Sequence, residues 1–517
     1  MLVYDVRVRT SAASLAREEQ LAWKLAEMAA DPVPLTPEVQ EMIVNRIIDN
    51  AAVAIAAINR PPAVSARAMA LGHPRTSGAA VFGEPSDRRV SPEWAAWANG
   101  TAVRELDMHD TFLAADFAHP GDNIPPILAV AQAMHCSGCD LLRGIATAYE
   151  IQINLAKSIS LHKHKIDHIA HLCPAQAAGI GTLLNLPAEI IYQAIQQAVH
   201  VSFTSRQSRK GEISSWKAYA PAHSGKLAVE AVDRAMRGET APSPIYEGED
   251  SVIAWMLDGP QAHYRVPLPA PGEPKRAILA SFTKQHSAEY QAQALIDLAF
   301  RMRQKIADRS QIEKIVIHTS AHTHHVIGTG AQDPQKLDPK ASRETLDHSI
   351  MYIFAVALED GTWHHVDSYV PERRNRPSTL QLWRSITTCE DPNWTERYHA
   401  SDPSQKAFGG RVVIFFRDGS HLEDEIAVAN AHPLGASPFR RDDYRHKFEI
   451  LTEHVITRQE SNRFVQAATN TAYLLPGQLH QLNVALPAGT LHQGRAGIFD
   501  HAAGSKAGRE INVDTDR

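Results

Sequence analysis

The densest group of side chains that could transfer protons lies in residues 104–123. If the helix predicted at its start continues, Asp107, Asp110 and Thr111 share one face, because residues three and four positions apart are neighbours on a helix. A proline–glycine turn then aims His119 from a loop beside these carboxylates. A histidine so placed can be held neutral or charged near pH 7, which suits general acid–base catalysis. A solvated helix end with its cap is the alternative interpretation.

Residues 161–171 form a second, histidine-rich group that leads directly into an apolar helix. His164 and His168, or His168 and His171, have the spacing of metal ligands on a helix. The glutamate of an HExxH motif is missing, however, and no third ligand is evident. The other interpretation is that His168 faces a cleft while its neighbours form a hydrated turn. The sequence favours this second interpretation.

Basic side chains occur in two further segments. Residues 205–217 combine arginines with Lys217, and Lys284 follows directly after a predicted linker. Arginine offers paired planar donors and lysine a point charge, so both segments suit a substrate with several carboxylates, although the first is also compatible with a plain basic loop. At the start of another apolar helix, Tyr352 lies one turn beyond His348.

Two other groups resemble metal or redox sites. One is the CxxC at Cys136–Cys139, which lacks a second ligand pair and for which we expect plain packing. The other is a histidine patch at positions 318, 322, 324 and 325, in a polar turn after a predicted strand, where we expect no metal. The 27 histidines leave a histidine-rich metal-binding protein as the non-catalytic alternative. No GxGxxG, GxxxxGK[ST] or GxSxG motif supports nucleotide binding or serine hydrolysis.

Helices must position most of these residues. From about residue 18 to residue 240, apolar side chains recur at helical spacing, as in Ile43, Ile47 and Ala51. Runs of alanine and glycine allow close helix approach in a compact bundle. Proline falls at the predicted first turn of helices near Pro37 and Pro187.

The composition changes at residues 264–274, where a proline-rich stretch predicts a linker and a domain boundary. Beyond it, residues 312–319 alternate as a strand, and strands at 412–416 and 425–428 flank an Asp-Gly hairpin turn. The pattern becomes helical again after residue 436, with helices expected at 444–455 and 462–474 and a frayed tail of about twenty residues. The sequence predicts a mainly α protein with a smaller α/β domain, divided into residues 1–270, 271–435 and 436–517.

Charge and composition exclude several partners. The formal net charge is −6, and no basic block is long enough to bind a nucleic-acid backbone. No apolar stretch approaches the roughly 20 residues that a spanning helix needs, so we expect no membrane insertion. The N-terminus lacks the pattern of a signal or transit peptide. Four cysteines in 517 residues fit a reducing compartment, and we expect a cytoplasmic location.

Eight motifs resemble the MmgE/PrpD family over nearly the whole chain. They are LDxxDTxLA and HPxDN at residues 106–123, DH at 167–168, RKGEISSWK at 209–217, KQHSAEYQ at 284–291, DHSIxYxxAVAL at 347–358, EDPxWxxRYH at 390–399 and AHPLG at 431–435. Together they are far more specific than any single motif.

The resemblance implies a larger helical domain built from both ends of the chain, a smaller α/β lid and a homodimer. It implies a tricarboxylate substrate, and most closely the removal of water from 2-methylcitrate to give 2-methyl-cis-aconitate in propionate catabolism, with possible side activity on citrate. A reaction like that of cis-aconitate decarboxylase, or an isomerisation of a related tricarboxylate, is the alternative. No metal or iron–sulfur cluster is expected, and the scattered cysteines agree with that. The residues that match the family's active site are Asp107, Thr111, His119, His168, Lys217, Lys284 and Tyr352.

Dehydration needs a base for a carbon-bound proton and an acid for the leaving hydroxyl. We expect His119, oriented by Asp107, to transfer protons, with Lys217 and Lys284 stabilising the carboxylate charge that develops. Thr111 and His168 are expected to hold the substrate, and Tyr352 to assist from the lid. Which group is acid and which is base stays open at this stage.

Overall fold

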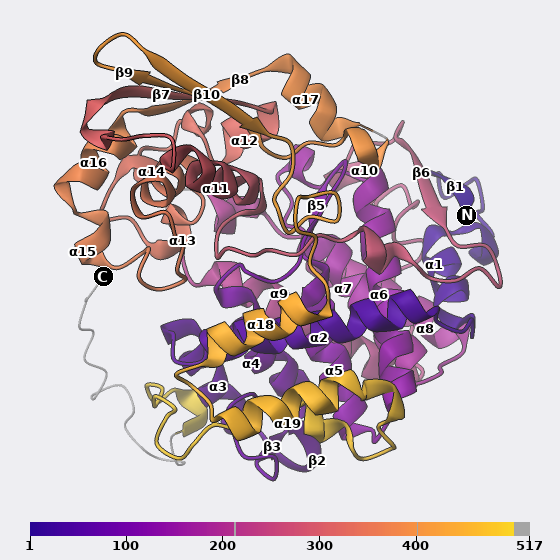
Figure 1. Ribbon diagram of the computed structural model, residues 1–517. Helices are drawn as coiled ribbons and strands as arrows, with labels where there is room; N and C mark the ends of the chain where they lie inside the picture. Colours follow the sequence, from indigo (N-terminus) through magenta and orange to yellow (C-terminus); the bar gives the residue numbers. More distant parts are fainter. Residues whose placement is uncertain (211–212, 401, 501–517) are drawn as a thin grey trace.

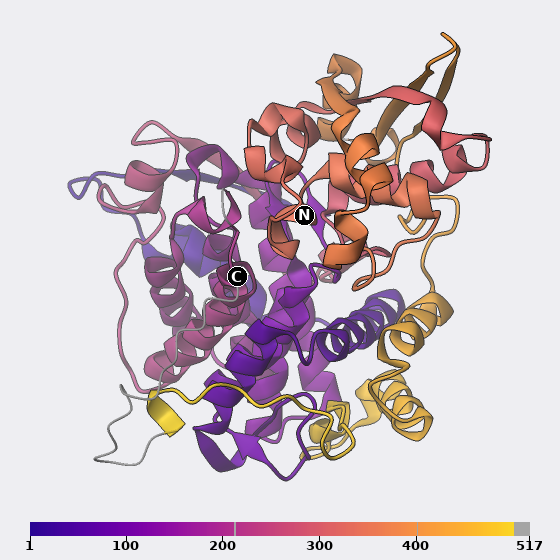
Figure 2. The ribbon, with the colours of Figure 1, turned by 90° about the vertical axis from the view of Figure 1, so that its left-hand side faces the viewer.

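The computed structural model describes residues 1–210, 213–400 and 402–500, and these form two units with separate hydrophobic cores (Figure 1). The larger core joins residues 39–280 to residues 444–484, so both ends of the chain contribute to it. The core of the smaller unit, which we call the lid, comes from residues 288–414. In Figure 2 the lid lies above the helical unit, and the last helices of the chain run along the side of that unit. The fold is mainly α with a smaller α/β unit, as the sequence predicts.

The helical unit is built around long helices that bury one another. Its helices are α1 (Leu21–Ala30), α2 (Pro37–Ala56), α3 (Pro61–Leu71), α4 (Pro92–Glu105), α5 (Ile124–Ala133), α6 (Gly138–Ser158), α7 (Ile169–Leu183), α8 (Ala188–Ser202), α9 (Trp216–Met236), α10 (Val252–Met256), α18 (Arg441–Thr452) and α19 (Arg458–Thr469). Short strands form the ribbons β1 (Leu2–Arg7) with β6 (His263–Leu268), β2 (Pro74–Ala80) with β3 (Arg89–Val90), and β4 (Phe112–Leu113) with β5 (Phe117–Ala118).

Small residues let these helices approach closely. A Cβ on Gly144 of α6 would lie only 2.7 Å from the carbonyl oxygen of Gly179 on α7, so the contact tolerates no larger side chain. Helix α2 starts with Pro37 in its first turn, as expected. Pro187 is instead the N-cap of α8, one position before the helix.

The lid packs helices against a four-stranded sheet of order β10-β9-β7-β8. Strand β7 pairs parallel with β8 and antiparallel with β9, which pairs antiparallel with β10. The elements are α11 (Tyr290–Arg303), β7 (Ile312–Thr319), α12 (Ala321–Val326), α13 (Arg343–Leu346), α14 (Ile350–Asp360), α15 (Pro371–Arg374), α16 (Pro377–Arg384), β8 (Ile386–Glu390), α17 (Pro392–His399), β9 (Gly410–Phe416) and β10 (His421–Ile426).

Several predicted boundaries were wrong by a few residues. The hairpin strand expected at 425–428 begins at His421, because the turn at Asp418 and Gly419 leads straight into it. Helices α18 and α19 each begin three or four residues earlier than predicted, since polar first turns precede their apolar faces. The expected linker begins as strand β6, which pairs with β1 from His263 to Leu268. Most of the tail predicted to fray lies outside the described residues.

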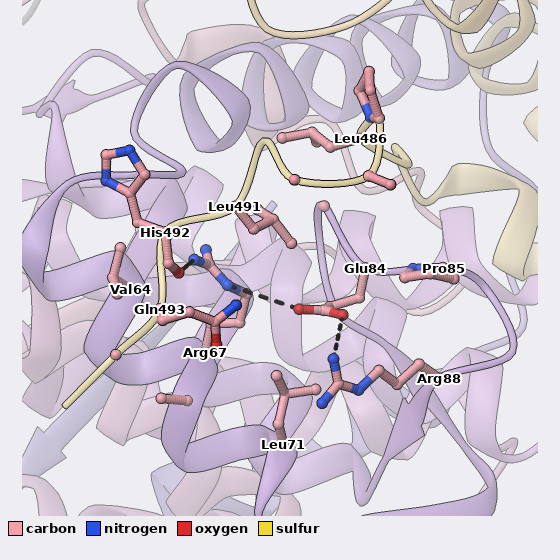
Figure 3. A pocket seen from close by; sticks show the side chains of 16 residues that line it. Val64, Arg67, Leu71, Glu84, Pro85, Arg88, Leu486, Leu491, His492 and Gln493 are labelled. Atoms are coloured by element: carbon pink, nitrogen blue, oxygen red, sulfur yellow. Dashed lines mark hydrogen bonds and ion pairs between the residues drawn. The ribbon is translucent and has the colours of Figure 1, made fainter. Parts of the chain in front are cut away.

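Residues 486–494, which we call the C-terminal strap, cross α3 and enclose a pocket of about 350 Å³ (Figure 3). Arg67 of α3 donates to the carbonyl oxygens of Ile58 at 2.7 Å and His492 at 2.8 Å, and thereby ties the strap down. Its Nε also lies 3.8 Å from Glu84, which pairs with Arg88 at 3.0 Å. Across the described residues, every helix is too short or too polar to span a bilayer.

Candidate active site

The segment after α4 carries the first predicted site residues, but it is not helical there. Helix α4 ends at Glu105, and Asp107 has a φ of 50°, so Asp107 and Thr111 do not share a helix face. That prediction was wrong because tertiary pairing overrides the helical spacing. Thr111 and Phe282 exchange two backbone hydrogen bonds of 2.9 and 2.7 Å, which join this segment to the chain entering the lid.

Asp110 fixes the loop that carries His119. Its carboxylate accepts a hydrogen bond of 2.6 Å from the Gly121 N–H and one of 3.0 Å from the Tyr149 hydroxyl. Arg46 of α2 pairs with it at 3.1 Å. Burial raises the pKa of Asp110, although the charge of Arg46 opposes the shift. This carboxylate therefore positions the loop and does not face a substrate.

Asp107 lies at the centre of a cluster of cations. The Lys284 ammonium lies 2.8 Å from its carboxylate and 3.0 Å from its carbonyl oxygen, Lys217 lies 3.4 Å away, and Arg104 also pairs with it. Burial favours the neutral carboxyl, but Arg104, Lys284 and Lys217 outweigh it and hold the pKa of Asp107 well below its usual range. Burial also lowers the pKa of Lys284, although Asp107 opposes the shift. The carboxylate stays ionised and keeps these cations in place.

Lys217 connects the helical unit to the lid. Its ammonium lies 2.9 and 3.0 Å from the carboxylate oxygens of Asp347 and 3.4 Å from Nδ1 of His348. Burial and the charge of Lys217 lower the pKa of His348 to about 4, so its ring is neutral near pH 7. Asp107 of the helical unit also contacts Lys217. Lys217 therefore joins Asp107 to Asp347 and His348 of the lid.

Asp107, Asp347 and His348 are also close enough to hold a metal ion, and within the described ranges no other group of three ligand-type residues is. The ammonium of Lys217 pairs with both carboxylates and lies within hydrogen-bond distance of the imidazole. A cationic side chain therefore already neutralises the charge that would attract an ion. The residues present do not fit a metal centre.

The histidines flagged as possible metal ligands have separate partners. His171 contacts the Ile159 carbonyl oxygen at 3.0 Å, and His164 lies 3.3 Å from Asp258. His322 stacks on Tyr398 with ring centroids 5.1 Å apart. Within the described residues, these histidines are therefore not gathered as the ligands of one ion.

His119 is buried, and one of its ring nitrogens is left without a partner. Its Nδ1 lies 3.4 Å from the carbonyl oxygen of Asp110, so the tautomer that fits carries its proton on Nδ1. Within the described residues Nε2 has no hydrogen-bond partner, and its lone pair can accept a proton. Among the described residues, Asp107 does not hydrogen-bond this ring, because its carboxylate pairs with Arg104 and Lys284, and Asp107 acts on His119 through its charge. Burial, Arg104 and Lys284 lower the pKa of His119 well below its usual range.

His168 lies beside His119, with ring centroids 5.4 Å apart. Its Nδ1 is 2.9 Å from Asp167, and its Nε2 is 3.7 Å from Asp122. Asp122 in turn lies 2.9 Å from His109. Two buried carboxylates therefore flank the His168 ring and fix its orientation, as the aspartate does for the histidine of a catalytic triad.

The structure does not bring two of the predicted residues into contact with this cluster through their side chains. The Thr111 hydroxyl donates to the Ala118 carbonyl oxygen at 3.0 Å and holds β4 against β5. Tyr352 lies in the core of the lid, where its hydroxyl donates to the carbonyl oxygen of Ser368 and its ring packs against Trp383 at 4.9 Å. Thr111 is near the cluster through its backbone, and the Tyr352 hydroxyl is engaged within the lid.

Several residues of the cluster received no role from the sequence. Arg104 lies on α4, whose other buried residues are mostly small. An arginine among them was the sequence feature that could have indicated a functional charge. Asp347 and His348 were visible only as part of a motif. Glu289 is the N-cap residue of α11, and burial raises its pKa to about 7, although Lys284 opposes the shift. It is therefore a group that changes protonation near neutral pH.

This arrangement can handle an anionic substrate. Two adjacent imidazoles, of which His119 has a free nitrogen, can accept and donate protons. The cations Arg104, Lys217 and Lys284 lie around Asp107 and stabilise negative charge in buried surroundings, where electrostatic interactions are stronger than in water. The site lies where the helical unit meets the lid.

Comparison with known proteins agrees with this architecture. A family model described as MmgE/PrpD N-terminal domain matches residues 19–265, and the MmgE/PrpD C-terminal domain matches residues 286–472. A relative named "2-methylcitrate dehydratase, mitochondrial", from Yarrowia lipolytica, is 27% identical over 386 residues, which cover 72% of this chain and 71% of the relative. The "2-methylcitrate dehydratase" of Salmonella typhimurium is 25% identical over 401 residues, covering 75% of this chain and 80% of the relative. Since the two matched domains account for most of its length, this chain belongs to the MmgE/PrpD family.

Proposed function

We propose that the protein is a hydro-lyase that removes water from 2-methylcitrate to give 2-methyl-cis-aconitate. The observation that carries the proposal is the pair of buried imidazoles, His119 and His168, beside the cations around Asp107. The names of the relatives from Yarrowia lipolytica and Salmonella typhimurium support the choice of substrate.

In the proposed reaction, Nε2 of His119 takes a proton from the carbon next to a substrate carboxylate. The electrons of that C–H bond form the C=C bond, and the C–O bond breaks. His168, held between Asp167 and Asp122, donates a proton to the departing hydroxyl, which leaves as water. Both rings return to their starting states when a proton passes from His119 back to His168. The chemistry needs no redox change.

Lys284 and Lys217 would bind substrate carboxylates and stabilise the enolate-like charge of the transition state. Burial lowers the pKa of His119 in the free protein, and so do the charges of Arg104 and Lys284. A substrate with three negative charges compensates them, so its binding raises the basicity of His119 when a base is needed. Substrate binding and base strength are therefore coupled at this site.

We propose that the enzyme uses no metal or iron–sulfur cluster. In support, Lys217 neutralises the carboxylates that would attract an ion. Only two of the four cysteines, Cys136 and Cys139, are close along the chain, which is fewer than an iron–sulfur cluster needs. We also propose a cytoplasmic homodimer, whose mass light scattering would measure.

The test is to incubate chelator-treated protein with synthetic 2-methylcitrate and follow the ultraviolet absorbance of the conjugated alkene. We expect absorbance to rise without added metal. Parallel reactions with citrate and cis-aconitate, with carbon dioxide measured, separate dehydration from decarboxylation and isomerisation. A folded protein that releases carbon dioxide from cis-aconitate but leaves 2-methylcitrate unchanged would overturn the proposal.

A further inference from the structure

A large pocket lies at the seam between the helical unit and the lid, away from the imidazole pair. Its volume is about 870 Å³, within the usual range of small-molecule sites. The helical unit and the chain that leaves it contribute residues 112–115, Lys157, Arg276, Leu279, Ala280 and Phe282. The lid and its return segment contribute His399, Ala400, Pro403, Lys406 and residues 432–434. That return segment passes beside β5 on its way to α18 (Figure 1).

Most of the pocket wall is apolar. Phe112, Leu113 and Leu279 come from the helical unit, and Phe282 precedes the lid. At the rim, Leu434 has an exposed fraction of 53%, which is high for a leucine. A hydrophobic body bound here would remove this surface from water, which is favourable at roughly 25 cal/mol per Å².

The charged residues of the wall all have the same sign. Lys157, Arg276 and Lys406 line the pocket together with two histidines, and no aspartate or glutamate does so among the described residues. Within those residues, neither lysine has a carboxylate within 4.0 Å, and Arg276 has only a distant contact of 4.0 Å with Glu38. An apolar pocket with unpaired cations complements a ligand that joins an anionic head to an apolar body.

We propose that this pocket binds an amphipathic organic anion, in which a carboxylate or sulfonate head is attached to an aliphatic or aromatic body. The ligand differs from a tricarboxylate substrate, which has no such body to fill the apolar wall. This pocket contains none of the residues of the imidazole pair or of the cation cluster around Asp107. It is therefore a second site, and the proposal does not depend on the reaction catalysed.

The position of the pocket connects it to the candidate active site. Phe282 in its wall exchanges backbone hydrogen bonds with Thr111, and Lys284 follows two residues later. A ligand that contacts both the helical unit and the lid favours the arrangement in which the two are together, because binding stabilises the state that binds. A ligand bound here would thus stabilise the contact between the lid and the helical unit.

The experiment titrates the full-length protein with 1-anilinonaphthalene-8-sulfonate and follows its fluorescence. We expect saturable binding of one probe per chain, displaced by decanoate and not by decanol. Lys406→Gln and Leu434→Asp should each weaken binding about tenfold, the expected effect of losing a hydrogen bond to a charged group or a buried apolar side chain. The matched controls Lys314→Gln and Leu475→Asp, which change exposed residues elsewhere, should bind as the unchanged protein does.

Three outcomes would overturn the proposal. The first is binding without saturation, or binding that the pocket variants and controls change equally. The second is displacement of the probe by 2-methylcitrate, which would place it in the candidate active site. The third is that the probe does not bind and that Leu434→Asp halves the molecular mass measured by light scattering. A second copy of the chain would then cover the pocket.

Discussion

Two regions of this molecule bury an arginine next to a carboxylate, and they use it differently. Under the C-terminal strap, Arg67 donates to two backbone carbonyl oxygens and lies 3.8 Å from Glu84 (Figure 3). In the candidate active site, Arg104 instead shares the carboxylate of Asp107 with two lysines. The first arginine holds a segment of chain in place, and the second belongs to a buried cluster of three cations around one carboxylate.

The difference shows that a buried ion pair does not by itself mark a functional site. Near Asp107 there are two additional features. His119 has a ring nitrogen without a partner, and carboxylates flank the ring of His168. Burial and several charges also displace the pKa values of Asp107 and His119. Such displaced groups concentrate at active sites, although structural ion-pair networks displace them too. Variants in both regions can test the distinction.

The largest expected effect is on catalysis at His119. His119→Asn should lower turnover roughly 10²- to 10⁴-fold, the usual contribution of a proton-transfer group, while circular dichroism and melting temperature stay close to those of the unchanged protein. His421→Asn on the exposed strand β10 is the control and should keep full turnover. Near-normal turnover of His119→Asn would show that this ring is not the base.

Next in size is the loss of stability under the strap. Arg67→Met should lower the free energy of unfolding by about 3 kcal/mol, because it leaves Glu84 and two backbone carbonyls without this partner. Denaturant titration measures the loss, and turnover per folded molecule should stay within about twofold. Arg88→Met, at an exposed position, should cost less than about 1 kcal/mol. A loss of turnover per folded molecule in Arg67→Met would show that Arg67, too, contributes to activity and is not purely structural.

A smaller effect concerns pH. The pKa of Glu289 is raised to about 7 in the folded protein, so its contribution to stability is present at low pH and is lost as pH rises through about 7. Between pH 5 and pH 8, the unchanged protein should lose on the order of 1 kcal/mol more than Glu289→Gln, a value reduced for partial exposure. Melting temperatures at the two pH values check this. Equal losses in both proteins would contradict the shift.

The smallest effect is expected at Tyr352. Tyr352→Phe removes the hydrogen bond to Ser368 in the lid and should lower stability by about 1 kcal/mol. Turnover should stay within about twofold, because the hydroxyl lies outside the cluster. A tenfold loss of turnover at unchanged stability would mean that this tyrosine reaches the substrate during the reaction.

Sequence reasoning identified the fold because helical periodicity and proline positions are local signals. The α/β character of the lid followed from alternating residues in β7 and from the Asp-Gly turn. Boundaries were less accurate where polar first turns hide the start of a helix, as in α18. Strand β6 was missed because its partner, β1, lies at the other end of the helical unit's sequence.

For the candidate site, residue types were predicted better than partners. His119, His168, Lys217 and Lys284 do lie around one region, but the helix-face argument for Asp107 failed once Thr111 paired with Phe282. Sequence spacing places Tyr352 one helical turn after His348, but it does not tell which of the two side chains faces the candidate site. Contacts such as that of Lys217 with Asp347 depend on how the units pack, and no local pattern contains them.

The return of the C-terminal helices to α2 also affects synthesis of the chain on the ribosome. Arg46 of α2 donates to the hydroxyl of Tyr444, which is 398 residues later, and Asp49 pairs with Lys447 at 2.6 Å. Because the ribosome adds about 5–20 residues per second, these partners are synthesised roughly 20–80 s after α2. During that interval its buried polar residues lack their final contacts, so the helical unit completes its folding only after the whole lid has been made.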